Sequence, residues 1–201
     1  MIRRATLAAL LLATLLPAAD EPGFQPLFNG RDLSEWDGDP QLWKVENGVI
    51  IGSTDGVQIP KNTFLIHKKT YGDFHLKFQV RLRNGNSGVQ FRSTVHPEWV
   101  VSGLQADMAE GNWWGSIYDE KGTRGVIANG WKDKAEKVVK ANDWNDYEII
   151  AQGENIRIVV NGLTTAEIKD NSKLEGALAL QLHRGPGMKA EFRNLRIKTG
   201  K

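Results

Sequence analysis

Short stretches of alternating apolar and polar residues recur along most of the chain, and this pattern restricts the folds that it can adopt. In residues 74–82, large apolar residues alternate with His, Lys, Gln and Arg, which is typical of a strand with one buried face. Asn47 and Gly48 separate two further alternating stretches, as do Asn161 and Gly162, and Asn-Gly is the strongest short signal for a two-residue hairpin. The chain is therefore predicted to fold mainly as antiparallel strands.

The other predicted strands are also short, and glycine-rich turns separate them. They lie at residues 64–67, 89–93, 100–107, 147–152, 177–183 and 190–197. Only residues 132–140 have a helical pattern, in a short and highly charged stretch. About ten short strands without a repeating helix indicate an all-β fold, an antiparallel β-sandwich. We expect a single domain, because no repeat or linker divides the chain.

The composition excludes several classes of function. The 201 residues include 26 basic and 24 acidic side chains, and the resulting net charge of +2 gives no reason to expect a nucleic-acid partner. The absence of cysteine excludes disulfides, thiolate zinc sites and thiol nucleophiles. Hydrophobic residues make up 40% of the chain, which is enough for one globular domain with a sizeable core.

The N-terminal segment differs in composition from the rest. Two arginines precede an apolar stretch at residues 5–16, and small residues follow before the first acid, Asp20. These features predict a signal peptide at residues 1–19, cleaved near Ala19, and a mature domain at residues 20–201. An uncleaved anchor is the alternative, although the apolar stretch is short for a bilayer. We expect a secreted or periplasmic protein without stable membrane association, whose formal charge falls from +2 to 0 on cleavage.

Three predicted strands place polar side chains on one face of a sheet. Because alternate residues of a strand face opposite sides, their large apolar residues would point into the core and the polar ones outward. The outward residues are Gln90, Arg92, Gln105, Asp107, Gln181 and His183. An antiparallel sheet can also have a polar solvent face without any function. Glycine and alanine flank these groups, however, and such a surface suits a polyhydroxylated ligand.

Adjacent tryptophans, Trp113 and Trp114, lie in a predicted loop at residues 112–118. They cannot both enter one face of the core, so at least one is expected to be exposed. A flat aromatic side chain packs well on the C–H face of a sugar ring. The alternative is that one tryptophan closes the end of the sandwich and the other lies in the core.

Six motifs, in order along the chain, resemble those of the 3-keto-disaccharide hydrolase domain family. They lie at residues 28–36, 86–92, 103–107 with 115–120, 143–148, 161–162, and 180–183 with 192–197. The resemblance extends over residues 23–198, nearly all of the mature protein. Other members carry Glu where this chain has Gly103, so the chain lacks one carboxylate that those members have.

The resemblance implies a concanavalin-like (LamG-like, jelly-roll) β-sandwich that is exported and acts on carbohydrate. The implied reaction is cleavage of glycosides whose C3 hydroxyl has been oxidised to a ketone. A sugar 3-dehydrogenase acting upstream would supply this substrate, and is the implied partner.

The implied reaction assigns roles to residues of the predicted polar face. A ketone at C3 acidifies the proton on C2, so a base can remove it, the group on C1 leaves, and added water completes a net hydrolysis. We expect His183 or Asp107 to be the base, because imidazole titrates near neutral pH and the carboxylate is the competing candidate. Arg92 is predicted to clamp the oxyanion or a hydroxyl, and Tyr118 to donate a proton.

The remaining predicted site residues would contact the sugar. They are Gln105, Gln90, Gln181, Asn86, Trp113, Trp114 and Arg124. A divalent metal, Ca²⁺ or Mn²⁺, is compatible with carboxylate, amide and histidine donors, but no motif assigns its ligands.

Two other functions are compatible with a sandwich of this kind. A non-catalytic carbohydrate-binding module would use the same polar face and aromatic loop. A laminarinase-type glycoside hydrolase would carry Glu-x-Asp-x-x-Glu where this chain has residues 105–110. The first position is the amide Gln105, which cannot form the glycosyl ester of a retaining enzyme.

Overall fold

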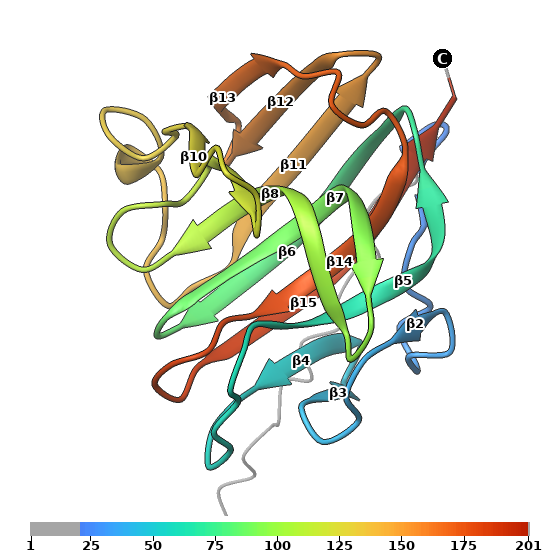
Figure 1. The fold of residues 1–201 in the computed structure, drawn as a ribbon, viewed down its shortest axis with the longest axis vertical. Coiled ribbons are helices and arrows are strands. Elements are labelled where there is room, and N and C mark those ends of the chain that lie inside the picture. Colours follow the sequence, from blue (N-terminus) through green and yellow to red (C-terminus); the bar gives the residue numbers. More distant parts are fainter. Residues whose placement is uncertain (1–20, 201) are drawn as a thin grey trace, which may run out of the picture.

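Two antiparallel sheets account for most of residues 21–200, the part of the chain that the computed structural model describes (Figure 1). In sheet 1 the order is β13 (Leu163–Lys169), β12 (Asn155–Val160), β11 (Asn145–Gln152), β6 (Phe74–Arg83), β15 (Lys189–Thr199), β4 (Val49–Ser53) and β3 (Trp43–Glu46), with β1 (Gln25–Pro26) beside β15. In sheet 2 it is β10 (Val126–Ala128), β9 (Ile117–Glu120), β8 (Val100–Ala109), β7 (Asn86–His96), β14 (Gly176–Leu182), β5 (Thr63–Tyr71) and β2 (Trp36–Asp37). The predicted all-β sandwich is confirmed.

The predicted signal peptide at residues 1–19 lies outside the described residues. From residue 21 to residue 200, the structure contains no helix long and apolar enough to cross a membrane.

Both Asn-Gly hairpins form as predicted. Asn47 and Gly48 have φ angles of 50° and 75°, and Asn161 and Gly162 have φ angles of 47° and 82°. Positive φ at both central residues matches the right-handed twist of the paired strands, and only Asn, Asp and Gly adopt it at low cost. The first turn joins β3 to β4 and the second joins β12 to β13.

The predicted helix at residues 132–140 is wrong. Only one 3₁₀ turn, η1 (Ala135–Lys137), forms in this stretch. Asp133 has a φ angle of 62°, and no side chain caps the turn at Lys134. Ala135 is the one buried residue of the turn. A short helix needs a broad apolar face to pack, and in this charged stretch only Ala135 and Val139 pack against the core.

Aromatic side chains fill the space between the two sheets. Phe78 and Tyr147 stack with their ring centroids 5.2 Å apart, and Trp114 lies 6.4 Å from the Tyr147 ring. Tyr147 is fully buried, and its hydroxyl donates a hydrogen bond of 2.9 Å to the backbone oxygen of Asp107. This bond joins β11 of sheet 1 to β8 of sheet 2 at the position of a predicted catalytic residue.

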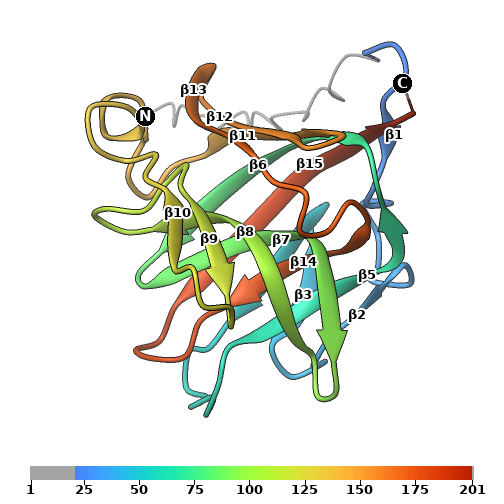
Figure 2. The same ribbon diagram turned by 45° about the horizontal axis from the view of Figure 1, so that its top comes forward.

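The far end of the β7–β8 hairpin projects past β5 (Figures 1 and 2). The backbone oxygen of Trp99 accepts a hydrogen bond of 3.0 Å from the amide of Phe64 there. Trp99 packs on a buried apolar cluster that includes Phe64, Val101 and Ala179. The outer face of sheet 2 is therefore partly covered by its own hairpin.

Replacing Gly52 by Ala should destabilise the sandwich. Gly52 lies opposite Trp43, and a Cβ atom on Gly52 would lie 2.4 Å from the indole ring. Overpacking of this kind costs about 1–3 kcal/mol, which chemical denaturation measures. Gly72→Ala is the matched control, because the nearest atom to its added Cβ would be 3.5 Å away. Equal stability of the two variants would contradict the expectation.

Candidate functional site

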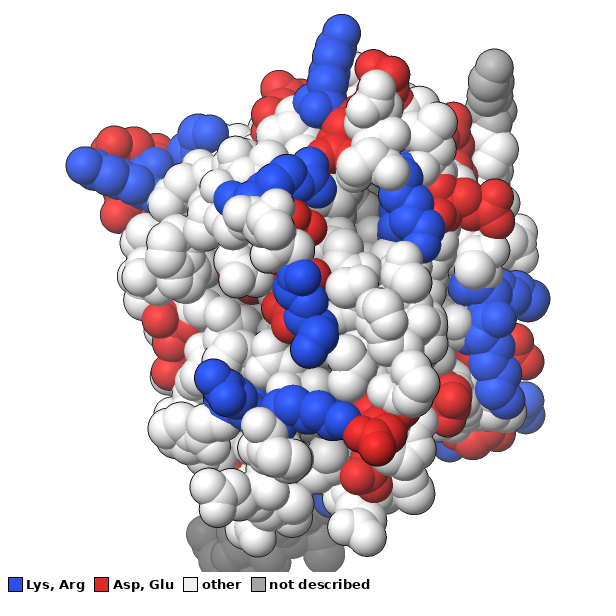
Figure 3. Space-filling view, viewed as in Figure 1, with Lys and Arg blue, Asp and Glu red and all other residues white. Residues whose placement is uncertain are grey.

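A recess of about 450 Å³ opens on the outer face of sheet 2. Figure 3 shows the molecule from this side, where Lys and Arg side chains are scattered over a mostly uncharged surface. The recess is lined by Asn62, Asn86, Gln105, Asp107, Trp113, Tyr118, Glu120, Lys121, Val126, His183 and Arg184. Six of the predicted site residues, Asn86, Gln105, Asp107, Trp113, Tyr118 and His183, are thus brought together.

Asp107 is the most strongly perturbed acid of the recess. Its side chain on β8 is 4% exposed, and its Oδ1 accepts a hydrogen bond of 2.8 Å from the Gln105 amide. Burial raises the pKa of Asp107 to about 7, and the negative charge of Glu120 adds to the rise. Hydrogen bonds from Gln105 and from the backbone of Met108 oppose it. Asp107 can therefore take up and release a proton near neutral pH.

Behind Asp107, buried glutamines form a hydrogen-bonded chain. The Gln90 amide donates to the Gln105 carbonyl at 2.8 Å, and the Gln105 amide donates to the Gln181 carbonyl at 3.3 Å. Each of these three side chains is at most 1% exposed. Gln105 lines the recess, whereas Gln90 and Gln181 do not. The predicted sugar contacts of Gln90 and Gln181 are therefore replaced by contacts with other side chains of the sheet.

Glu120 is a site residue that the strand predictions missed. It lies on β9, is 7% exposed, and accepts hydrogen bonds from Asn62 at 3.0 Å and from Gln181 at 3.3 Å. It belongs to the motif at residues 115–120, but β9 was not predicted as a strand, so alternation could not place it. Asn62, Lys121 and Arg184 were missed for a related reason, because they lie outside the strands.

His183 follows β14 and is partly exposed at the recess. Its Nδ1 lies 2.6 Å from the backbone oxygen of Arg184. A carbonyl oxygen only accepts hydrogen bonds, so Nδ1 carries the proton and Nε2 of the neutral ring is free to accept one. Tyr118 is also partly exposed there, so a second proton-transfer group lies in the same recess.

Arg92 does not line the recess with the six residues, and lies instead on the wall of an adjoining hollow of about 240 Å³. The pairing of β7 with β8 shifts register between Gln90 and Thr94, and Arg92 has a φ angle of 48°. This bulge ends the strict alternation on which the prediction rested. The guanidinium donates to the backbone oxygens of Gly72 at 2.9 Å and Gly153 at 2.6 Å, and to Asp73 at 3.0 Å. Arg92 therefore ties together turns of the sandwich instead of clamping an oxyanion.

Trp114 also requires correction, and Arg124 lies beside the recess rather than in it. Trp114 is 4% exposed in the core and cannot stack on a sugar, whereas Trp113 is partly exposed at the recess. The alternative with one tryptophan in the core is therefore the observed arrangement. Arg124 pairs with Asp119 at 3.1 Å and with Asp170, on the wall of the adjoining hollow of about 240 Å³. The hollow and the recess share Glu120 and Lys121.

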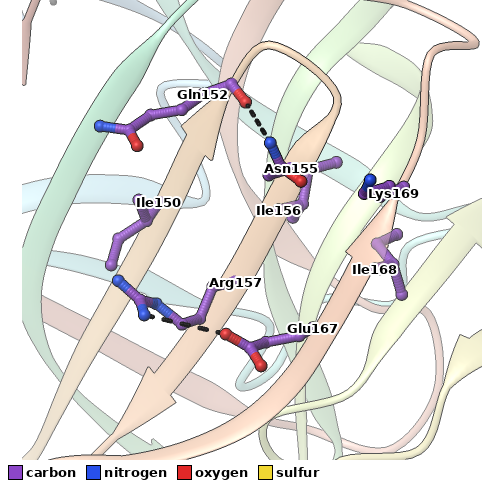
Figure 4. Close-up of a pocket in the computed structure, with 8 residues that line it drawn as sticks. All are labelled: Ile150, Gln152, Asn155, Ile156, Arg157, Glu167, Ile168 and Lys169. Atoms are coloured by element: carbon purple, nitrogen blue, oxygen red, sulfur yellow. Dashed lines mark hydrogen bonds and ion pairs between the residues drawn. The ribbon is translucent and has the colours of Figure 1, made fainter.

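A larger recess, of about 570 Å³, lies over β11, β12 and β13 of sheet 1 (Figure 4). Its lining includes the aliphatic residues Ile150 and Ile168 and the ion pair of Arg157 with Glu167 at 3.8 Å. Both charged partners of this pair are well exposed. The recess thus contains no buried acid like Asp107, so sheet 2 holds the stronger candidate for chemistry.

Within residues 21–200, no group of three or more His, Asp and Glu side chains is placed to hold a metal ion. The expected Ca²⁺ or Mn²⁺ stays a prediction.

The fold and the recess together define an antiparallel β-sandwich with a protonatable buried acid on the outer face of one sheet. Residues 23–198 match the family described as the 3-keto-alpha-glucoside-1,2-lyase-like domain, and the chain belongs to this family. The resemblance found in the sequence motifs is therefore confirmed. No curated protein is similar enough in sequence to match the chain.

Solved structures with similar folds come from several carbohydrate-related proteins. A candidate glycosyl hydrolase from Parabacteroides distasonis is 20% identical, with a TM-score of 0.68 over 89% of this chain and 94% of that chain. A carbohydrate-binding module from Bacillus subtilis is 16% identical, with a TM-score of 0.64 over 82% of this chain and 96% of that chain. A lichenase derived from a mouse hindgut metagenome is 10% identical, with a TM-score of 0.57 over 83% of this chain and 94% of that chain. At these identities the similarity shows the fold alone.

Replacing Asp107 by Asn should change how stability depends on pH. The pKa of Asp107 is about 7 in the folded protein and near 3.9 in an unfolded chain, so the folded wild type binds more protons between these values and loses stability as the pH rises. Asp107→Asn has no carboxyl group to ionise at this position, so its stability does not fall in this way. Its advantage in unfolding free energy should grow by up to roughly 4 kcal/mol between about pH 4 and pH 7 and then level off. Denaturant titrations across this range measure the difference, and a constant difference would contradict the expectation.

Trp113→Ala and Trp114→Ala should affect stability differently. Trp114 is buried against Tyr147, so its removal should cost about 3–5 kcal/mol of unfolding free energy. Trp113 is partly exposed, and its removal should cost much less. Thermal or chemical unfolding measures both, and a larger loss for Trp113→Ala would contradict this division.

Proposed function

We propose that this protein cleaves glycosides that carry a ketone at C3, by elimination across C1 and C2 followed by addition of water. Its family makes it a carbohydrate-active β-sandwich, and its neighbours in structure include candidate glycosyl hydrolases and a carbohydrate-binding module. The observation that carries the finer proposal is the pKa of Asp107, about 7, in a recess that also exposes His183 and Tyr118. A general base works best when its pKa lies near the operating pH.

The reaction is balanced without an added oxidant or reductant. The base takes the proton from C2, and the electron pair of that C–H bond forms an enolate with the C3 ketone. As the ketone re-forms, C1 and C2 become doubly bonded, the bond from C1 to the leaving oxygen breaks, and that oxygen takes a proton. Water then adds across the double bond, with its oxygen on C1 and a proton on C2. The products are the 3-keto sugar and the released alcohol or sugar.

We assign the base to Asp107 and keep His183 as the alternative base. Asp107 lies deeper and is ionised above about pH 7, whereas His183 is at the edge with its Nε2 free. His183 or Tyr118 would then give the proton to the leaving oxygen. Lys121 and Arg184 are the cationic side chains that line the recess, and they replace Arg92 as candidates to stabilise the enolate.

The adjoining hollow provides room for the leaving group. It shares Glu120 and Lys121 with the recess and adds the hydroxyl side chains of Thr94, Ser102 and Ser172. We place the 3-keto sugar beside Asp107 and Trp113, and a second sugar in the hollow. An upstream sugar 3-dehydrogenase would supply this substrate, and export through residues 1–19 would place the reaction outside the cytoplasm.

No step of the proposal depends on a metal. A role for Ca²⁺ or Mn²⁺ is open to direct test, by adding each ion or a chelator to the purified protein during the assay.

Two competing functions fit the site less well. A binding module gains nothing from a buried acid whose ionisation costs stability. A laminarinase-type enzyme needs two carboxylates about 5 to 5.5 Å apart. Its motif would place the first at Gln105, which is an amide, and the second at Glu110. Glu110 does not line the recess, and its carboxylate accepts a hydrogen bond of 2.9 Å from the backbone of Asn84 in the turn before β7.

The test compares a plain disaccharide with its 3-keto form. Release of sugar from the 3-keto form alone, slowed by deuterium at C2, supports the proposal. Cleavage of the plain sugar alone would favour a laminarinase-type enzyme. Cleavage of neither, with binding to both and with metal ions supplied, would favour a binding module.

Variants of the recess should separate chemistry from binding. Asp107→Asn and His183→Ala should each lower kcat for the 3-keto substrate by roughly 10²- to 10⁴-fold, the usual contribution of a positioned acid or base. Trp113→Ala should act mainly on KM, because stacking stabilises ground and transition states alike. Glu110→Gln is the control and should leave kcat and KM unchanged. A loss of activity in Glu110→Gln as large as in Asp107→Asn would contradict the assignment.

A further inference from the structure

We propose that Gln105 is a positioning residue that holds Asp107 in its reactive orientation, and that buried side chains on both sides prevent the Gln105 amide from turning over. This inference rests on the proposed function for its catalytic consequence. The hydrogen-bonded arrangement itself can be tested without turnover.

The direction of the Gln105 amide matters because its two ends have opposite chemistry. The nitrogen donates hydrogen bonds and the oxygen only accepts them. With the nitrogen toward Asp107, the bond of 2.8 Å to Oδ1 stabilises the ionised base. With the oxygen toward Asp107, two acceptors would face each other in a buried site, which is costly.

Glu120 fixes the direction from one side. It presents carboxylate oxygens as acceptors, and Gln181 turns its amide nitrogen toward one of them, at 3.3 Å. The Gln181 oxygen then faces Gln105 and accepts from the Gln105 nitrogen, also at 3.3 Å. Both hydrogens of the Gln105 nitrogen thus have acceptors, one on Gln181 and one on Asp107.

Gln90 and Ser93 complete the arrangement from the other side. The Gln90 nitrogen donates to the Gln105 oxygen at 2.8 Å, and the Ser93 hydroxyl lies 2.8 Å from the Gln90 oxygen. Gly88 gives the space for this layer, since a Cβ atom there would lie 2.5 Å from the Gln105 amide carbon. Gly88 is paired with Asp107 across β7 and β8.

Gln90 and Gln181 have no contact with the recess that would explain them as sugar ligands. Gln90 and Gln181 are both 0% exposed, and neither lines the recess. Burying an amide is favourable only when its hydrogen bonds are made, and here the bonds lead to Asp107.

Several other groups around Asp107 also affect its protonation. The titratable and charged ones are Tyr118, Glu120 and Lys121 of β9 and its turn, His183 and Arg184 after β14, and Tyr147 of β11. The experiment therefore changes Gln105 and Gln90, which carry no charge, and leaves these groups in place.

The test measures the Asp107 titration by carboxyl ¹³C NMR, assigned with Asp107→Asn, in the wild type and two variants. Gln105→Met is close in shape and has no donor, so the pKa of Asp107 should rise, because the Gln105 hydrogen bond lowers it. Gln90→Met leaves the amide of Gln105 held from one side, and should give a smaller rise. In Gln90→Met, kcat should fall roughly five- to ten-fold, which corresponds to the free energy of about one hydrogen bond. KM should be unchanged, and the acid limb of the pH profile of kcat should move to higher pH.

Ser87→Ala is the matched control. The Ser87 hydroxyl is fully buried on β7 and donates to the backbone oxygen of Gln181 at 2.7 Å, outside the amide chain. Its loss should lower stability without moving the Asp107 titration. An unmoved titration in both Gln105→Met and Gln90→Met, with folding verified by their unfolding transitions, would overturn the proposal. If the titration moves but no variant or wild type turns over a 3-keto substrate, the positioning role stands and the proposed function fails.

Discussion

The outer face of sheet 2 carries a buried layer of amides and carboxyls, and the need to keep each of them hydrogen-bonded is the constraint on which the site depends. Buried polar groups without partners cost more than most single contacts contribute. Gln105 lies at the centre of this layer, with hydrogen-bond partners on β7, on β14 and on its own strand, β8. The same burial that requires these bonds raises the pKa of Asp107 to about 7. The stability of the layer and the chemistry of the acid therefore have one physical origin.

A bulge interrupts the pairing of β7 with β8 next to this layer. The register shifts between Gln90 and Thr94, with Arg92 at positive φ and Gly103 at a φ angle of 132°. Beyond the bulge, the hairpin crosses to β5, and Trp99 covers apolar residues of the outer face. The bulge also turns Arg92 toward backbone oxygens of Gly72 and Gly153 in the turns.

The recess differs from a simple binding surface in the kind of group that it buries. Hydroxyls of a sugar can be held by exposed amides and aromatic rings at little cost to the fold. An acid held near its midpoint of ionisation at neutral pH reduces stability as the pH rises, and groups perturbed in this way cluster at functional sites. Glu120 increases the cost through its charge and, through Gln181, also keeps a donor directed at Asp107. These opposing effects fit the role of general base that we propose for Asp107, because such a group must be stable in both protonation states.

The sequence alone determined the features that depend on neighbours along the chain. Alternation and the Asn-Gly turns predicted the sandwich, and alternation placed Gln105 and Asp107 on the face that forms the recess. The placement held there because β8 is regular from Gln105 to Ala109, and side chains of a regular strand must alternate.

Only the tertiary structure decided the positions that depend on contacts between distant segments. Arg92 left the face because a bulge changed the direction of its strand, and backbone oxygens from remote turns offered it hydrogen bonds. Trp114 rather than Trp113 entered the core because Tyr147 of the other sheet packs there. Glu120 joined the recess because β9 pairs with β8, and its short strand has too few residues to show a pattern of its own. Local patterns specify which way a regular strand faces, whereas bulges, loop conformations and pairing partners depend on free energies contributed by residues far away in the sequence.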